Sequence, residues 1–172
     1  MDNKEKLEEY IRNKRHVCWV LNPLVEDYSV DSTIAVYVLN PVSFFEKVPE
    51  SVLDVLRDKG YTRLYVLYLF SRIGEFGEWA DLPAEELLDS RCNDVIGKII
   101  PDVGKVLFAY GQLPDERMRE LVDQRMRDVQ QRIESEVPGM EFYRFGALTE
   151  TGDPKSLVDV QDTDEEHRFY FA

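Results

Sequence analysis

Residues 15–22 read Arg-His-Val-Cys-Trp-Val-Leu-Asn, and Pro23 follows them directly. Every residue between His16 and Asn22 is apolar or aromatic, and the run stops at the Asn-Pro turn. A short apolar run bounded by turn residues is typical of a strand buried on both faces, as in the centre of a parallel sheet. Ligands of such sheets bind beyond the carboxyl ends of the strands. The stretch therefore predicts a central strand and a site in the loop 22–33.

Strand-like and helix-like segments alternate along the rest of the chain, which favours an α/β fold. We expect a single domain over residues 1–172, with three α/β/α layers and a mostly parallel sheet of about four to five strands. Residues 34–47 are ambiguous, because the β-prone start Ile34–Leu39 leads into Asn-Pro and a phenylalanine pair. Residues 159–172 form an acidic segment followed by a terminal strand. The predicted strands are 16–21, 61–70, 105–110, 140–147 and 167–171, and the predicted helices are 1–14, 49–59, 83–100 and 114–136.

The chain is strongly acidic, with 34 acidic against 21 basic side chains and a net charge of −13. Proteins that bind duplex DNA through its phosphate backbone need a basic surface, so sequence-independent binding of duplex DNA is not expected. The acidity serves either solubility or mimicry of a polyanion that engages a basic protein partner. No stretch approaches the roughly 20 apolar residues that a membrane span needs. The N-terminus lacks a signal-peptide core, so a cytoplasmic location is expected.

The two cysteines, Cys18 and Cys92, lack the spacing of a metal site and read as small apolar core residues. A disulfide between them is not expected in a reducing compartment. With only two histidines in the chain, a His-rich metal site is excluded. No Walker loop, Gly-x-Gly-x-x-Gly or nucleophile elbow is present, so we predict neither a cofactor nor a metal.

Candidate residues must therefore come from the loops after the predicted strands, at 22–33, 71–82, 110–114 and 147–157. Asp31 is the carboxylate nearest the first strand that could act as a base or orient a water. The alternative is that Asp31 bonds its own loop backbone or caps a helix that begins at Ser32 or Thr33, and this alternative is favoured.

Other polar and aromatic residues of these loops have similar paired interpretations. Asn22 either reads a base-like amide edge or is a turn residue set by the following proline. Arg72 and Lys155 either bind a phosphate or another anion, or form plain surface salt bridges. Tyr110 and Trp79 either stack on a planar ligand or cap the core.

The order of short motifs in residues 15–158 resembles a bacterial and phage family known as domain of unknown function sixteen-forty-three. The motifs are Asn22-Pro23, Asp31-Ser32-Thr33, Leu69-Phe70 with Arg72 after it, Asn93-Asp94, Ala109-Tyr110-Gly111, and Gly146, Thr149, Gly152, Pro154 and Leu157. The family pattern runs Asn-Pro-Ser, Asp-Pro-Thr, Asn-Leu-Phe, Ala-Trp-Gly and Thr-x-x-Gly-x-Pro-Arg-His-Pro-Leu. The resemblance implies that Pro23, Thr33, Gly111 and Thr149 belong to the ligand site.

The same order is similar, more distantly, to the uracil-DNA glycosylase type of fold. That kinship implies recognition of a nucleobase, with or without cleavage of its glycosidic bond. This chain departs from both patterns, because Tyr68 replaces an asparagine, Tyr110 a tryptophan, and Lys155-Ser156 a His-Pro pair. Lys155 is then the candidate to replace the lost histidine as a cation. The departures and the net charge argue against an ordinary DNA glycosylase.

The sequence thus predicts a small nucleotide-like or nucleobase-like ligand at the carboxyl edge of the sheet. Asp31 and Lys155 are the candidate catalytic residues, and the candidate ligand-binding residues are Asn22, Pro23, Thr33, Arg72, Tyr110, Gly111 and Thr149. It leaves open whether the ligand is turned over. The alternative is a non-catalytic interaction protein whose acidic surface engages a basic partner.

Overall fold

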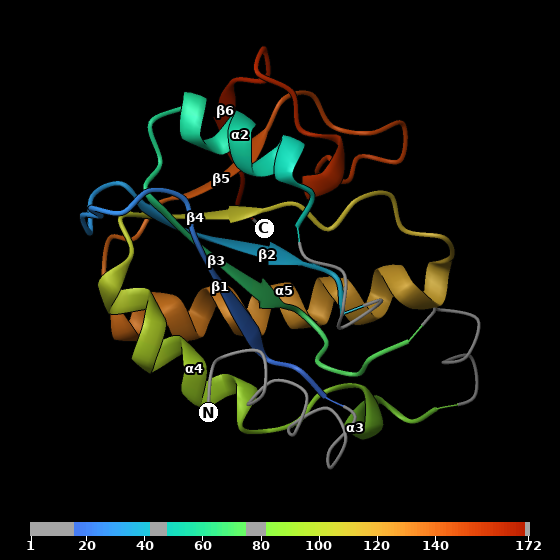
Figure 1. The fold of residues 1–172 in the computed structure, drawn as a ribbon. Coiled ribbons are helices and arrows are strands. Elements are labelled where there is room, and N and C mark those ends of the chain that lie inside the picture. The colour runs from blue at the N-terminus through green and yellow to red at the C-terminus, as the bar shows by residue number, and fades with distance from the viewer. Residues whose placement is uncertain (1–15, 42–47, 75–81, 171–172) are drawn as a thin grey trace.

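The computed structural model describes residues 16–41, 48–74 and 82–170, which form a mixed α/β fold around one six-stranded sheet (Figure 1). The sheet order is β1-β3-β2-β4-β5-β6. The four inner strands run parallel, and β1 and β6 pair antiparallel at the two edges. The predicted N-terminal helix lies outside the described residues. The strands are β1 Trp19–Pro23, β2 Thr33–Val38, β3 Arg63–Tyr68, β4 Lys105–Phe108, β5 Phe142–Phe145 and β6 Glu166–Arg168.

The centre of the sheet is β2, which resolves the ambiguity of residues 34–39 in favour of a strand. Its sequence Thr-Ile-Ala-Val-Tyr-Val is rich in β-branched residues, and its first five residues are buried. It lies between β3 and β4, so both of its faces are covered by packed side chains. This is the pattern expected of a central parallel strand.

The prediction that the first apolar run is a central strand is wrong. β1 is an edge strand and runs antiparallel to β3, with Trp19 opposite Leu67 and Pro23 opposite Arg63. Trp19 is 42% exposed, so one end of the strand reaches solvent. An apolar run shows that a strand is partly buried, but it does not show the strand's position or direction in the sheet. The reversal moves the carboxyl end of β1 to the edge opposite the carboxyl ends of the four parallel strands.

Helices lie on both faces of the sheet, with α2 on one face and α4 and α5 on the other (Figure 1). Alternate side chains of each strand pack into the two apolar cores, because successive residues of a strand point to opposite faces of the sheet. Helix α5 buries the stripe Met118, Val122, Met126, Val129 and Ile133, which recurs at helical spacing. No helix among the described residues is both long enough and apolar enough to cross a membrane. The helices are α2 Glu50–Asp58, α3 Ala84–Leu87, α4 Cys92–Ile99 and α5 Glu116–Glu136, with 3-10 turns η2 Ile100–Asp102 and η3 Leu157–Asp159.

The single helix predicted for residues 83–100 is two helices. Leu88 is extended, and the Asp89 side chain accepts a hydrogen bond from the Arg91 amide. The amide of Asp89 donates to the hydroxyl of Ser71. Aspartate and serine side chains offer backbone groups alternatives to helical bonds, and here they break the helix.

Cys18 and Cys92 form a disulfide that ties the residue before β1 to the first residue of α4. The prediction of two unpaired core cysteines is therefore wrong. The two Cα atoms are 5.1 Å apart, although 74 positions separate the residues in the sequence. Disulfides are typical of oxidising compartments, so the pairing does not fit the reducing compartment that the sequence prediction assumed. A cytoplasmic location stays a prediction.

Candidate functional site

The carboxyl edge of the parallel strands has a topological switch point between β2 and β4. From β2 the chain moves to β3 on one side, and from β3 it crosses to β4 on the other. Ligands of open α/β sheets commonly bind where the strand order reverses in this way. Asn40 follows β2 at this point, and Tyr110 and Gly111 follow β4.

The polar side chains at this edge bond to the protein itself. The amide of Asn40 is buried and donates to the carbonyl of Gly74 at 2.8 Å. Asp153 is 1% exposed and accepts from Arg119 at 3.0 Å and from the amide of Leu113 at 3.1 Å. Burial raises the pKa of Tyr110, whose hydroxyl stays protonated. These groups hold the loops of this edge in place.

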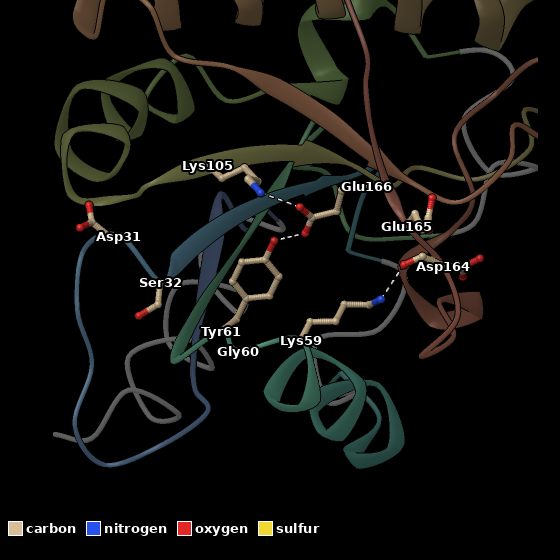
Figure 2. A pocket seen from close by; sticks show the side chains of 9 residues that line it. All are labelled: Asp31, Ser32, Lys59, Gly60, Tyr61, Lys105, Asp164, Glu165 and Glu166. Carbon is tan, nitrogen blue, oxygen red and sulfur yellow. Dashed lines mark hydrogen bonds and ion pairs between the residues drawn. The ribbon is translucent and has the colours of Figure 1, made fainter.

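A pocket of about 610 Å³ opens near the amino ends of β2 and β4, on the α2 face of the sheet (Figure 2). Its walls come from the loop before β2, the end of α2, the start of β4 and the turn into β6. Two lysines and four carboxylates line it, so its charge is mixed. The lining residues are Asp31, Ser32, Lys59, Gly60, Tyr61, Lys105, Asp164, Glu165 and Glu166.

The turn after α2 directs Tyr61 into the pocket. Gly60 has φ +93°, a conformation that glycine adopts without steric cost. The Gly60 amide donates to the carbonyl of Arg57, and the Tyr61 amide donates to the carbonyl of Leu56. This pair of bonds is the Schellman motif that ends many helices at a glycine. The helix therefore ends where the predicted helix 49–59 ends, and the turn places the phenol beside the pocket.

Gly104 brings the start of β4 against the loop that carries Asp31. A Cβ atom on Gly104 would lie 2.7 Å from the Asp31 carbonyl oxygen, which is too close. The amide of Gly104 donates to the carbonyl of Thr33 at 2.9 Å. Only glycine allows this approach, and Lys105 enters the pocket from the next position.

Lys105, Glu166 and Tyr61 point toward one another in the pocket (Figure 2). The Lys105 Nζ atom lies 2.5 Å from Glu166 Oε2, and the Tyr61 hydroxyl donates to Glu166 Oε1. The Lys105 ammonium also lies 4.6 Å from the centre of the Tyr143 ring. The side chains of Lys105 and Glu166 are 28% and 20% exposed. Burial lowers the pKa of Lys105 and raises the pKa of Glu166, because each charged form loses water.

Lys59 and Lys155 fix the turn that carries Asp164. Lys59 donates to the Asp164 carbonyl at 2.6 Å, and Lys155 lies 2.8 Å from the Asp164 carboxylate. Burial alone would raise the pKa of Asp164, but bonds from Lys155 and the Gln161 amide lower it on balance. Lys155 therefore reaches the pocket only through Asp164.

The structure does not bring the sequence-predicted site residues together. Asp31 lines the pocket, and Asn22, Pro23 and Thr33 lie at the same amino edge without lining it. The prediction that the 22–33 loop shares an edge with the other three loops is wrong, because β1 runs antiparallel. Thr33 is fully buried, and its hydroxyl donates to the Ser29 carbonyl.

The remaining predicted residues lie elsewhere. Tyr110 and Gly111 follow the carboxyl end of β4, and the Gly111 amide donates to Pro154. Arg72 lies 3.6 Å from Glu86, and Thr149 accepts a bond from the Asp153 amide. The Arg72 contact fits the salt-bridge alternative, and the burial of Tyr110 in a core cluster fits the alternative that it caps the core. Trp79 lies outside the described residues.

Sequence reasoning missed Lys59, Tyr61, Lys105 and Glu166 as site residues. Lys105 was only the first residue of a predicted strand, and Glu166 was one member of an acidic patch. No spacing rule connects them, because 61 positions separate the pair. Within the described residues, no group of three or more His, Cys, Asp or Glu side chains is placed to hold a metal ion.

Comparison with protein-family models, curated proteins and solved structures finds no match to this chain.

Proposed function

We propose that the protein binds a small ligand with a nucleobase-like hydrogen-bonding edge, and that the Lys105–Glu166 pocket holds it. The observation that carries the proposal is a donor and an acceptor side by side, both half-buried in one pocket. The volume of about 610 Å³ falls in the range of roughly 300–1,000 Å³ typical of small-molecule sites.

The pair retains hydrogen-bonding capacity after its own bond is made. A lysine ammonium has three donors, and Lys105 uses one of them on Glu166. A carboxylate can accept about four bonds, and Glu166 accepts from Lys105 and Tyr61. The spare donors and lone pairs lie next to each other, so a planar edge with an amino group beside a ring acceptor complements them.

Cytosine and adenine carry such an edge, with an exocyclic amino group that a carboxylate accepts from and a ring nitrogen that a lysine donates to. The four carboxylates of the pocket favour a neutral or cationic ligand group over a bare anion. The proposed site is therefore at the amino edge, and not at the carboxyl edge expected from the sequence.

The test is a thermal-shift and calorimetric titration with matched ligands. Adenine is compared with purine, and cytosine with 2-pyrimidinone, because the second member of each pair lacks only the amino group. Ligand at 100 times its Kd stabilises the fold by roughly 2.7 kcal/mol, which is roughly 5–11 °C for a chain of this size. We expect the amino-bearing ligands alone to bind.

Variants then locate the site. Lys105→Met removes the donors with little change of volume, and Glu166→Gln removes the carboxylate charge. Each is expected to weaken binding at least roughly tenfold, the cost of about 1.4 kcal/mol of polar contact. Lys98→Met, on the exposed last turn of α4, is the matched control and should bind normally. A flat screen would contradict the proposal and leave a basic protein partner as the hypothesis to pursue.

The kinship with the uracil-DNA glycosylase fold, including its three-layer arrangement, is likewise a proposal. Its support is the parallel order β3-β2-β4-β5 with α2 on one face and α4 and α5 on the other. A degenerate glycosylase-like activity gains no support from the predicted residues, because Asp31 and Tyr110 lie at opposite edges of the sheet.

A further inference from the structure

Lys105 is an amine held in an open pocket beside a carboxylic acid and a phenol. Its side chain lines the pocket and is 28% exposed, so a small molecule in the pocket can contact it. Glu166 lies 2.5 Å away on β6. Glu141, just before β5, raises the pKa of Lys105, but the larger effect of burial lowers it on balance. The Tyr143 ring covers another side of the ammonium group. An amine, an acid within bonding distance and an open volume are the parts that imine chemistry requires.

We infer that Lys105 is a carbonyl-reactive amine, which forms an imine with a small hydroxylated aldehyde or ketone while Glu166 transfers the protons. This inference rests on the pocket of the proposed function, but not on a base-like ligand. Burial lowers the pKa of Lys105, which increases the share of free amine, and it raises the pKa of Glu166, which increases the share of carboxylic acid.

The step balances without an oxidant or reductant. The Lys105 nitrogen attacks the carbonyl carbon, a C–N bond forms, and the carbonyl electron pair moves to oxygen, which takes the proton lost by nitrogen. Glu166 then donates its proton to that hydroxyl, the C–O bond breaks, and water leaves. The resulting iminium loses its N–H proton to the Glu166 carboxylate. The net reaction joins amine and carbonyl into imine and water.

The other lining residues indicate the class of carbonyl compound. Asp31, Glu165 and the Ser32 hydroxyl offer acceptors around the same volume, and hydroxyl groups are the neutral donors that suit them. An open-chain sugar or a short hydroxyaldehyde has both the carbonyl group and these donors. A plain alkyl aldehyde has the carbonyl group alone.

The experiment treats the full chain with glyceraldehyde and sodium cyanoborohydride at pH 7, and maps the reduced adducts by digestion and mass spectrometry. Propanal, which has the same carbon chain without hydroxyls, is the parallel probe. We expect glyceraldehyde to modify Lys105 at least roughly threefold faster than the exposed Lys98, because burial lowers the pKa of Lys105 and leaves more free amine. We expect propanal to show a smaller preference.

Glu166→Gln tests the proton transfer. If Glu166 is the acid, the Lys105 rate falls at least threefold while the Lys98 rate stays constant. Without that role, removing the carboxylate would free more amine and raise the Lys105 rate, which would overturn the assignment.

Equal rates at Lys105 and Lys98 would overturn the inference, and an equal preference with propanal would overturn the substrate class. Preferential labelling without base binding would contradict only the proposed function. Base binding with equal labelling would contradict only this inference.

Discussion

Opening the Cys18–Cys92 disulfide is expected to cost the fold about 4 kcal/mol. The bond closes a loop over 74 positions, and chain entropy gives a stabilisation of about 4.4 kcal/mol for a loop of that length. For a chain of this size each kcal/mol moves the melting temperature by roughly 2–4 °C. Reduction should therefore lower the melting temperature by roughly 8–16 °C, a large part of the total stability of such a domain.

The assay is urea unfolding of the same protein, oxidised and reduced, followed by circular dichroism. The double variant Cys18→Ser, Cys92→Ser is the control. Its free energy of unfolding should equal that of the reduced protein and should not change when reductant is added. Thiol titration of the unreduced, unfolded chain should find no free thiol. The reasoning is refuted if two thiols titrate, or if oxidised and reduced proteins differ by less than about 1 kcal/mol.

Three further perturbations test the core, a helix cap and an ion pair. Val129→Ala, at a fully buried position of α5, should destabilise the fold by about 2 kcal/mol in denaturant unfolding, whereas Val158→Ala, 60% exposed, should change it by less than about 0.5 kcal/mol. Asp115→Ala removes the side chain that accepts from the amide three residues later and should cost about 1 kcal/mol, while Asp115→Asn should retain most of it. The bond from Arg91 lowers the pKa of Asp89 to about 2, so its contribution is complete above pH 4 and lost as the pH falls toward 2. Asp89→Asn should flatten the pH dependence of the melting temperature in that window, and an unchanged slope would exclude the pair as its cause.

Local patterns in the sequence predicted most of the inner architecture. The stripe of α5 recurs at helical spacing, and α2 ends at the end of the predicted helix 49–59. Pairing is not a local property, because the direction of β1 depends on β3, whose paired residues come 40 or more positions later. The same apolar run is compatible with the centre or the edge of a sheet, and only the strand order decides between them.

The candidate site likewise combines a residue that local sequence suggested with contacts that only the strand pairing creates. Asp31 lines the candidate pocket and was a candidate in the sequence because it is a carboxylate in a loop near a strand end. The sequence prediction placed it at the carboxyl edge, whereas it lies at the amino edge of the parallel strands. Lys105 lies on β4 and Glu166 on β6, which run in opposite directions with β5 between them. No spacing in the sequence predicts that the two side chains form a contact. The close approach that Gly104 permits could be noticed in the sequence only as one glycine before a strand.

The three residues of β6 pair with β5 alone among the described strands, and the first of them is Glu166. Short elements at a sheet edge open locally at a lower free energy than the whole domain unfolds. Each such opening carries Glu166 away from Lys105 and dismantles the pocket. A ligand that bridges the two side chains must therefore also hold β6 in place, and part of its binding energy goes into that docking. Substitutions that destabilise the pairing of β6 with β5 are then expected to weaken ligand binding, even where they change no residue that lines the pocket.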